Sequence, residues 1–351
     1  MVEKLKIDDS FGERADRILI DVRTPAEFEK GHIPKALNLP LFTDEERVIV
    51  GTTFKQESPE RALLQGLDFV GSKMSDFIIT AKEFAPDKRI AIHCWRGGKR
   101  SGSMAWLLDL AGFDVKVLEG GYKAYKNFIR HEILLKRFNF IVLGGRTGSG
   151  KTHILRALSD RGEQVIDLEK LAHHKGSAFG WMGETTQPNS DQFENDLFEA
   201  LLKMDPEKKV WLENESRNIG SVYIPDVFWP EMKNSPVINI EIPFEERVQI
   251  LVDEYSQFPK EELMTSFNKI KKRLGGQNLN DAESALAEDD FHRAAEIALK
   301  YYDKSYQFLL DNNKAPEIHM LNLLAFNPVE NAKALIEFYD SLSLQFSKTN
   351  V

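Results

Sequence analysis

The chain has 351 residues, which is long enough for two domains with separate hydrophobic cores. Its hydrophobic content of 42% and charged content of 29% are those of an ordinary globular protein, and we expect neither a signal peptide nor a membrane span. A net charge of −9 argues against non-specific coating of nucleic acid, and a single cysteine excludes an intrachain disulfide. We therefore expect a cytoplasmic protein.

The first part of the chain alternates short strands and helices. Thr24 and Pro25 indicate a helix start, as cap and first helical residue. Alternation of this kind predicts an α/β domain with a parallel sheet and with reactive groups at the carboxyl ends of strands. The expected elements are a strand over residues 17–23, an extended segment over 36–40, a helical insertion from 43 to about 84, a strand over 115–119 and a helix over 122–136.

The only cysteine, Cys94, lies at a predicted strand-to-helix turn. An apolar run ends at His93, and helical spacing begins at Ser101. Amides at a helix N-terminus and nearby cations lower the pKa of a thiol, so this position predicts a reactive catalytic thiolate rather than an inert core cysteine. The residues expected to form the surrounding anion-binding loop are Arg96, Gly97, Gly98, Lys99, Arg100 and Ser101.

A second motif follows the next predicted strand, residues 138–143. Residues 145–152 match G-x-x-x-x-G-K-[ST], and a helical pattern comes next, as a phosphate-binding loop (P-loop) requires. Backbone amides in such a loop surround a diphosphate or triphosphate, the lysine contacts its outer oxygens, and the last residue holds Mg²⁺. The predicted diphosphate-binding residues are Gly145, Thr147, Gly148, Ser149, Gly150, Lys151 and Thr152, with Mg²⁺ held through Thr152.

The rest of the chain continues as a second α/β domain. Further strands are expected near residues 164–168, 208–213 and 236–242, and the chain beyond Phe244 reads as mostly helical. We therefore expect a first domain over residues 1–136 and a P-loop domain with a helical C-terminal part over residues 137–351.

Several charged residues of the second domain are candidate supporting groups. Carboxylates at strand ends support Mg²⁺ in P-loop proteins, and the candidates here are Asp167, Glu213 and Glu215, with Arg217 as a phosphate partner or as an ion pair to a neighbouring glutamate. His173 and His174 have no cysteine or carboxylate at metal-ligand spacing, so we interpret them as non-metal residues. Lys271, Lys272 and Arg273 are either RNA contacts or a solvated helix face.

Several stretches of the first domain resemble rhodaneses: residues 19–28, 31–38 and 118–122, together with the Cys94 loop. The combination with a P-loop domain, and the stretches 43–47, 51–56, 171–180 and 215–220, resemble the tRNA 2-selenouridine synthase family over nearly the whole chain.

This resemblance implies a transferase acting on the 2-thiouridine wobble base of certain tRNAs. Sulfur would be replaced by selenium from selenophosphate, through an S-geranyl intermediate made from geranyl diphosphate. The P-loop would hold the diphosphate, and Cys94 would carry selenium as a selenyl sulfide or otherwise act on the selenium donor. The expected partners are thiolated tRNA and a supplier of selenophosphate.

Two other functions fit parts of the sequence. The spacing from Cys94 to Arg100 also matches cysteine-dependent phosphatases with a rhodanese-like fold, although such a function leaves the P-loop domain without a role. A sulfurtransferase or degenerate rhodanese joined to a nucleotide-binding regulatory domain is the second alternative. Because no N-K-x-D guanine-reading element follows the P-loop, a GTPase switch is disfavoured, and ATP is the nucleotide left open to a kinase or regulatory switch of this kind.

Overall fold

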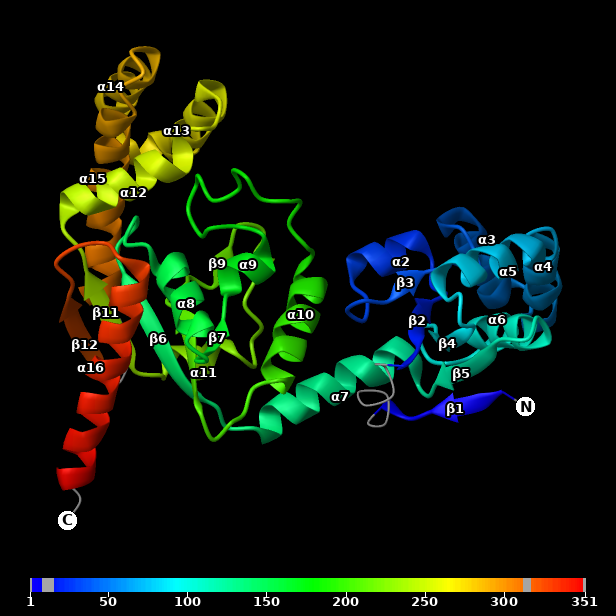
Figure 1. Cartoon of the computed structure of the whole chain (residues 1–351). Coiled ribbons are helices and arrows are strands. Elements are labelled where there is room, and N and C mark those ends of the chain that lie inside the picture. The colour runs from blue at the N-terminus through cyan, green and yellow to red at the C-terminus, as the bar shows by residue number, and fades with distance from the viewer. Residues whose placement is uncertain (1, 8–15, 312–316, 350–351) are drawn as a thin grey trace. The chain divides into compact units, whose positions relative to one another are not determined.

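The computed structural model describes residues 2–7, 16–311 and 317–349. The chain forms two compact units (Figure 1): residues 1–135 with 194–202, and residues 136–193 with 203–351. Each unit contains a five-stranded parallel sheet with helices, so the predicted α/β fold class is confirmed. Within the described ranges, no helix combines the length and the apolar character needed to cross a membrane.

The sheet of the first unit has the strand order β1-β5-β4-β2-β3. Its central strand β4 is an apolar run in which Ile90 and Ile92 are fully buried, as expected for a parallel strand covered on both faces. Cys94 follows this central strand. The elements of the unit are β1 (Glu3–Leu5), β2 (Ile18–Asp21), α2 (Pro25–Lys30), β3 (Leu37–Asn38), α3 (Asp44–Gln56), α4 (Pro59–Gly71), α5 (Met74–Phe84), β4 (Arg89–His93), α6 (Lys99–Leu110), β5 (Asp114–Leu118) and α7 (Gly121–Leu135).

Local signals in the sequence account for most of these elements. Thr24 and Glu27 form a reciprocal capping box at the start of α2, with Pro25 as the first helical residue. The helical insertion is confirmed as α3, α4 and α5. The sequence analysis missed β1, because a strand of only three residues carries too short a pattern to detect.

The sheet of the second unit has the order β12-β11-β6-β8-β7, and the P-loop follows its central strand β6. Both motifs therefore occupy the same place in their sheets, at the carboxyl end of the middle strand, where parallel α/β sheets bind ligands. The elements of the second unit are β6 (Asn139–Gly145), α8 (Lys151–Asp160), β7 (Gln164–Ile166), α9 (Leu168–Ala172), β8 (Lys209–Glu213), β9 (Asn218–Ile219), β10 (Val222–Tyr223), α11 (Trp229–Lys233), β11 (Val237–Glu241), α12 (Phe244–Tyr255), α13 (Lys260–Leu274), α14 (Gly276–Ala287), α15 (Phe291–Asp311), β12 (Ile318–Asn322) and α16 (Pro328–Thr349). Between α9 and β8 the chain forms α10 (Ser190–Leu202), whose residues 194–202 belong to the first unit.

One prediction for this unit needs correction. Residues 164–168 do not form one strand, because Asp167 accepts a hydrogen bond from the amide of Lys170 and so caps α9. The C-terminal part is mostly helical, as predicted, and its one strand among the described residues, Ile318–Asn322, pairs with β11 as an edge strand. Its side chains alternate between exposed and half-buried, so it lacks the apolar run that marked the other strands.

Candidate functional site

The loop after β4 surrounds the sulfur of Cys94, whose residue is only 4% exposed. The amide of Gly98 donates to Sγ at 3.4 Å, and the Ser101 hydroxyl lies 3.3 Å from Sγ. The same hydroxyl lies 3.2 Å from the Gly98 carbonyl oxygen, so its single proton can go to either acceptor. These groups stabilise a negative charge on the sulfur.

The thiolate is favoured by hydrogen bonds. Burial raises the pKa of the Cys94 thiol. Hydrogen bonds from the Ser101 hydroxyl and from the amides of Arg96, Ser101 and Gly98 lower this pKa by more, so the net shift is downward from the ordinary 9.0. The sequence predicts that cationic side chains as well as amides favour the thiolate. The structure instead gives this role to one hydroxyl and the loop backbone.

Arg100 is engaged with an acidic partner. Its guanidinium donates to the Glu27 carboxylate at 2.6 and 3.2 Å, which lowers the pKa of Glu27 against the opposing effect of burial. Arg96 and Lys99 are exposed. Arg100 therefore ties the start of α6 to α2, and the loop cations that face solvent are Arg96 and Lys99.

Two glycines allow the loop to close against the start of α7. Gly97 and Gly121 have φ of +64° and +60°, which favours glycine. The amide of Tyr122 donates to the Cys94 carbonyl at 2.9 Å. A Cβ on Gly121 would lie 2.2 Å from that carbonyl oxygen. The close approach of two backbones explains the glycine at residue 121.

Replacing Gly121 by alanine is expected to destabilise the Cys94 loop by about 2 to 5 kcal/mol, from the left-handed backbone and the steric overlap together. Hydrogen exchange of β4 and α6 amides measures this loss directly. Gly102→Ala is the matched control, because a Cβ there meets nothing within 4 Å and the residue is helical. This control should stabilise α6 by about 0.5 to 1 kcal/mol. Equal protection in both variants would contradict the close packing described here.

The P-loop of the second unit has the backbone expected from its glycines. Gly148 and Gly150 have φ of +75° and +69°, and Gly150 caps α8 in the left-handed conformation. Lys151 Nζ donates to the Gly145 carbonyl at 3.0 Å. The Gly145 amide donates to the Tyr306 hydroxyl at 2.8 Å, so this predicted diphosphate ligand is already bonded to α15. Diphosphate binding therefore depends on the P-loop residues after Gly145, residues 147–152.

Side chains from α12 and α15 hold the P-loop in place. Arg247 donates to the Thr147 carbonyl at 3.0 Å and forms an ion pair with Asp303 at 2.6 Å. Tyr306 also donates to the Asn239 side chain. Because Arg247 is 4% exposed, its charge is used within the fold rather than in solvent. The P-loop is thus preorganised by side chains that follow it in sequence by 100 residues (Arg247) and 161 residues (Tyr306).

Glu169 is the carboxylate that reaches the P-loop, and the sequence analysis missed it. The Thr152 hydroxyl donates to Glu169 Oε2 at 2.8 Å. Asp167, two residues earlier, is the cap of α9. Glu213 accepts from the Glu169 amide at 2.7 Å, and so positions the start of α9. The sequence signal was weak because Glu169 belongs to a five-residue helix and not to a strand end.

Glu169, Glu213 and Glu215 are buried close to one another. Burial raises the pKa of Glu215 to about 8, and the neighbouring Glu169 carboxylate adds to the effect. Burial also raises the pKa values of Glu169 and Glu213. Oε2 of Glu213 has no hydrogen-bond partner among the described residues. A bound cation would offset this accumulation of carboxylates.

These residues fit Mg²⁺. Adjacent oxygens in an octahedral Mg²⁺ shell lie about 2.9 Å apart, close to the 2.8 Å between Thr152 Oγ1 and Glu169 Oε2. Mg²⁺ is usually bound by one or two carboxylates, waters and substrate phosphates, so a larger protein ligand set is not needed. Across the described ranges, no group of three or more His, Cys, Asp or Glu side chains forms a metal site. Thr152 and Glu169 are therefore the residues that would hold Mg²⁺ beside a diphosphate.

The other charged residues singled out in the sequence do not line the cavity beside the P-loop. The sequence predicts that Arg217 contacts phosphate or pairs with a neighbouring glutamate. In the structure it forms an ion pair with Asp226 instead. His173 ends α9 with φ of +50°. Lys271, Lys272 and Arg273 form the exposed last turn of α13, where cations also complement the helix dipole.

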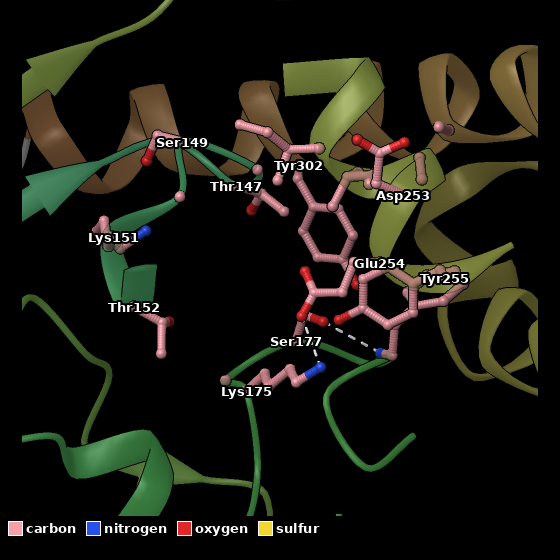
Figure 2. Close-up of a pocket in the computed structure, with 18 of the residues that line it drawn as sticks. Thr147, Ser149, Lys151, Thr152, Lys175, Ser177, Asp253, Glu254, Tyr255 and Tyr302 are labelled. Carbon is pink, nitrogen blue, oxygen red and sulfur yellow. Dashed lines mark hydrogen bonds and ion pairs between the residues drawn. The ribbon is translucent and has the colours of Figure 1, made fainter. Parts of the chain in front are cut away.

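The P-loop opens into a cavity of about 760 Å³. Figure 2 shows Tyr302, Glu254 and Tyr255 across this space from Lys151 and Thr152. Lys175 forms an ion pair with Glu254 at 2.6 Å at the same wall. Apolar residues complete the lining: Phe179 comes from the segment between α9 and α10, and the helices α13 to α15 supply Leu263, Phe267, Leu286, Phe291, Ala294 and Ala298. One cavity therefore combines an anion cradle with a hydrocarbon-like wall.

Known families match both units. The family described as tRNA 2-selenouridine synthase AAA domain matches residues 138–322, and the rhodanese-like domain matches residues 6–128. A Sulfurovum protein named tRNA 2-selenouridine synthase is 35% identical over 330 residues, covering 84% of this chain and 89% of the relative. The chain belongs to the tRNA 2-selenouridine synthase family. Similar family members occur in Pseudomonas fluorescens (37% identity, 86% of this chain and 90% of the relative) and Nitrosomonas europaea (41%, 69% and 64%).

Two of the stretches that suggested this family line the cavity. In residues 171–180, Gly176 has φ of +68°, and a Cβ there would lie 2.8 Å from the Glu215 carboxylate. In residues 215–220, Glu215 and Ser216 are lining residues. The family-specific stretches of the second unit thus form the wall that faces the P-loop.

Proposed function

We propose that this protein converts 2-thiouridine at the tRNA wobble position to 2-selenouridine. Selenophosphate supplies the selenium, and an S-geranyl intermediate is made first from geranyl diphosphate. The names of the relatives support the overall conversion. The cavity that joins a P-loop to an apolar wall supports the choice of geranyl diphosphate, and it is the observation on which this part of the proposal depends.

In the first step, the sulfur of 2-thiouridine attacks C1 of the geranyl group. The carbon–oxygen bond to diphosphate breaks, diphosphate leaves, and the base loses its N3 proton to water. Negative charge builds on the departing diphosphate, so preorganised donors accelerate the step. Lys151 and the P-loop amides are these donors, and Mg²⁺ on Thr152 and Glu169 adds positive charge when bound.

The apolar wall of the cavity favours binding of geranyl diphosphate over binding of a nucleotide. Burying half of a ten-carbon chain contributes about 4 kcal/mol, at about 0.8 kcal/mol for each methylene. Phe267, Leu286 and Ala298 belong to one hydrophobic cluster, which suits a hydrocarbon chain better than the polar ribose of ATP. The hydrocarbon chain should therefore lie against the helices α13 to α15.

In the second step, selenium replaces the geranylated sulfur. A carbon–selenium bond forms at C2, the carbon–sulfur bond breaks, and geranylthiol leaves. Water takes the phosphoryl group as phosphate, and N3 regains a proton. We assign Cys94 to this step: its thiolate takes the phosphoryl group of selenophosphate, the selenium–phosphorus bond breaks and hydrogen selenide is released to attack C2, and water then cleaves the sulfur–phosphorus bond to return the thiolate. The exposed Arg96 and Lys99 attract the anionic donor.

A basic surface is needed for the tRNA partner. Lys271, Lys272 and Arg273 are exposed at the end of α13, on the hairpin that α13 and α14 form (Figure 1). Contacts between such residues and phosphates release counterions, so the affinity for tRNA should decrease as salt increases.

Reconstitution tests the proposed function as a whole. Purified protein is incubated with 2-thiolated tRNA, geranyl diphosphate, Mg²⁺ and selenophosphate. The tRNA is then digested to nucleosides, which are identified by mass spectrometry. We expect S-geranyl-2-thiouridine when selenophosphate is omitted, and 2-selenouridine when both donors are present. Omitting geranyl diphosphate should leave 2-thiouridine unchanged. Efficient selenation without the prenyl donor would refute the intermediate.

A further inference from the structure

Trp95, the residue after Cys94, is an exposed aromatic at the thiolate loop. It is 40% exposed, although a side chain of this size is usually mostly buried. Its neighbours Arg96 and Lys99 are exposed cations. None of the hydrogen bonds to Cys94 involves the indole ring, so the thiolate itself does not explain an exposed tryptophan here.

The support beneath Trp95 is rigid. Its ring lies 5.6 Å from the ring of Tyr122, at an interplanar angle of 48°. The amide of Lys123 donates to the Trp95 carbonyl at 3.0 Å. The Tyr122 ring has the Arg23 guanidinium 4.0 Å from its centre, and its hydroxyl accepts from Asn195 at 2.9 Å. A ring held in this way loses little entropy when a flat ligand binds to it.

The anchor beneath Tyr122 is buried. Arg23 is 1% exposed, and its guanidinium donates to Asp21 at 2.6 Å and to the Gly31 carbonyl at 2.7 Å. The Arg23 charge is therefore used to hold the aromatic pair. The exposed positive charge beside Trp95 comes from Arg96 and Lys99 instead, at positions suited to phosphate groups.

We propose that Trp95 is the stacking surface for the target pyrimidine while that base reacts at the Cys94 loop. The inference rests on the proposed function, because it takes the thiolated RNA base as the ligand. A base that reacts must leave its own stack, and enzymes compensate for this by stacking it on an aromatic side chain. Trp95 supplies an exposed aromatic face on the loop that surrounds the reactive sulfur, and its two neighbouring cations bind the flanking phosphates.

A protein partner is the other ligand that an exposed tryptophan suits. The cations on either side favour RNA, since phosphate contacts position a nucleic acid while stacking holds the base. The Trp95 and Tyr122 rings are tilted by 48° and so are not stacked face to face. The Tyr122 ring therefore does not cover a face of the indole in the way that a stacked base would. The experiment below distinguishes the two ligands.

Tryptophan fluorescence reports stacking directly. An anticodon stem-loop RNA carrying S-geranyl-2-thiouridine at the first anticodon position is titrated into the full-length protein, without selenophosphate. We expect quenching that is lost in Trp95→Phe and retained in Trp106→Phe. Trp106 is the matched control, because it is an exposed tryptophan on α6 that we assign no role. Quenching that is equal in both variants, or absent in the wild type, would overturn the proposal and leave a protein partner as the ligand.

Kinetics supply a second measurement. Base stacking on an aromatic residue predicts a decrease of about tenfold to a hundredfold in kcat/KM for selenation in Trp95→Ala. Trp95→Phe should remain within about threefold of the wild type, since phenylalanine also stacks. KM for selenophosphate should be unchanged in both variants, which separates stacking from a collapse of the anion loop. An active Trp95→Ala enzyme with wild-type kinetics would disprove the role of Trp95 and leave the proposed function intact.

The two proposals fail separately. If the wild-type protein does not selenate RNA, the proposed function is wrong, and fluorescence still shows whether Trp95 stacks on a pyrimidine. If Trp95→Ala does not fold, the comparison of Trp95→Phe with the wild type still tests the proposal. The expected fluorescence quenching requires the indole ring of Trp95, which Trp95→Phe removes.

Discussion

Replacing Cys94 by serine is expected to abolish selenium incorporation and to leave geranylation of the tRNA within about twofold of the wild type. Serine keeps nearly the shape of cysteine, and the amide of Gly98 can still donate to its oxygen. A hydroxyl is not ionised at neutral pH, so the anionic nucleophile is lost while the loop remains. Nucleoside mass spectrometry with each donor in turn measures the two steps separately.

The thiolate can be measured independently of activity. Because Cys94 is the only cysteine, the ultraviolet thiolate absorbance of the protein reports on this residue alone. The net downward shift of its pKa predicts that the thiolate forms below pH 9.0 and is lost as the pH decreases through the folded-state pKa. Ser101→Ala should raise this pKa, since one of its stabilising hydrogen bonds is removed. Loss of both geranylation and selenation in Cys94→Ser would contradict a division of steps between the units.

Replacing Lys151 by alanine is expected to weaken the binding of geranyl diphosphate by about tenfold to a hundredfold, because a hydrogen bond to a charged group contributes about 1.5 to 3 kcal/mol. Geranylation should decrease further, since charge on the diphosphate increases in the transition state. Isothermal titration and single-turnover geranylation measure the two effects. Lys203→Ala is the control, because Lys203 is exposed and does not line the cavity.

A second variant separates the two ends of the cavity. Ala298→Phe adds volume to the apolar wall, where Ala298 is 5% exposed. It should weaken geranyl diphosphate binding and leave inorganic diphosphate binding unchanged, whereas Lys151→Ala weakens both. Thermal unfolding checks the cost of overpacking, which is about 1 to 3 kcal/mol in a filled core. Tighter binding of ATP than of geranyl diphosphate by the wild type would show that the second unit is a nucleotide-binding domain.

Local patterns in the sequence determined the positions of both reactive loops. Cys94 and residues 145–152 each follow an apolar strand and precede a helix, and such strand–loop–helix signals involve neighbours along the chain. The fold class and the helical insertion were predicted for the same reason. The two α/β units therefore follow from periodicity and glycine placement, which do not require knowledge of distant contacts.

Only the tertiary structure decided which side chains serve each loop. Glu27 lies 73 residues from its partner Arg100, and Arg247 lies 100 residues from Thr147, so no local pattern could join them. Glu169, rather than Asp167, meets Thr152 because Asp167 is used as the cap of α9. The apolar wall behind the P-loop arises where helices of the C-terminal part pack around it. From the sequence, the apolar faces of these helices could form ordinary hydrophobic core or line a cavity. Periodicity shows which face of a helix is buried but not what it is buried against.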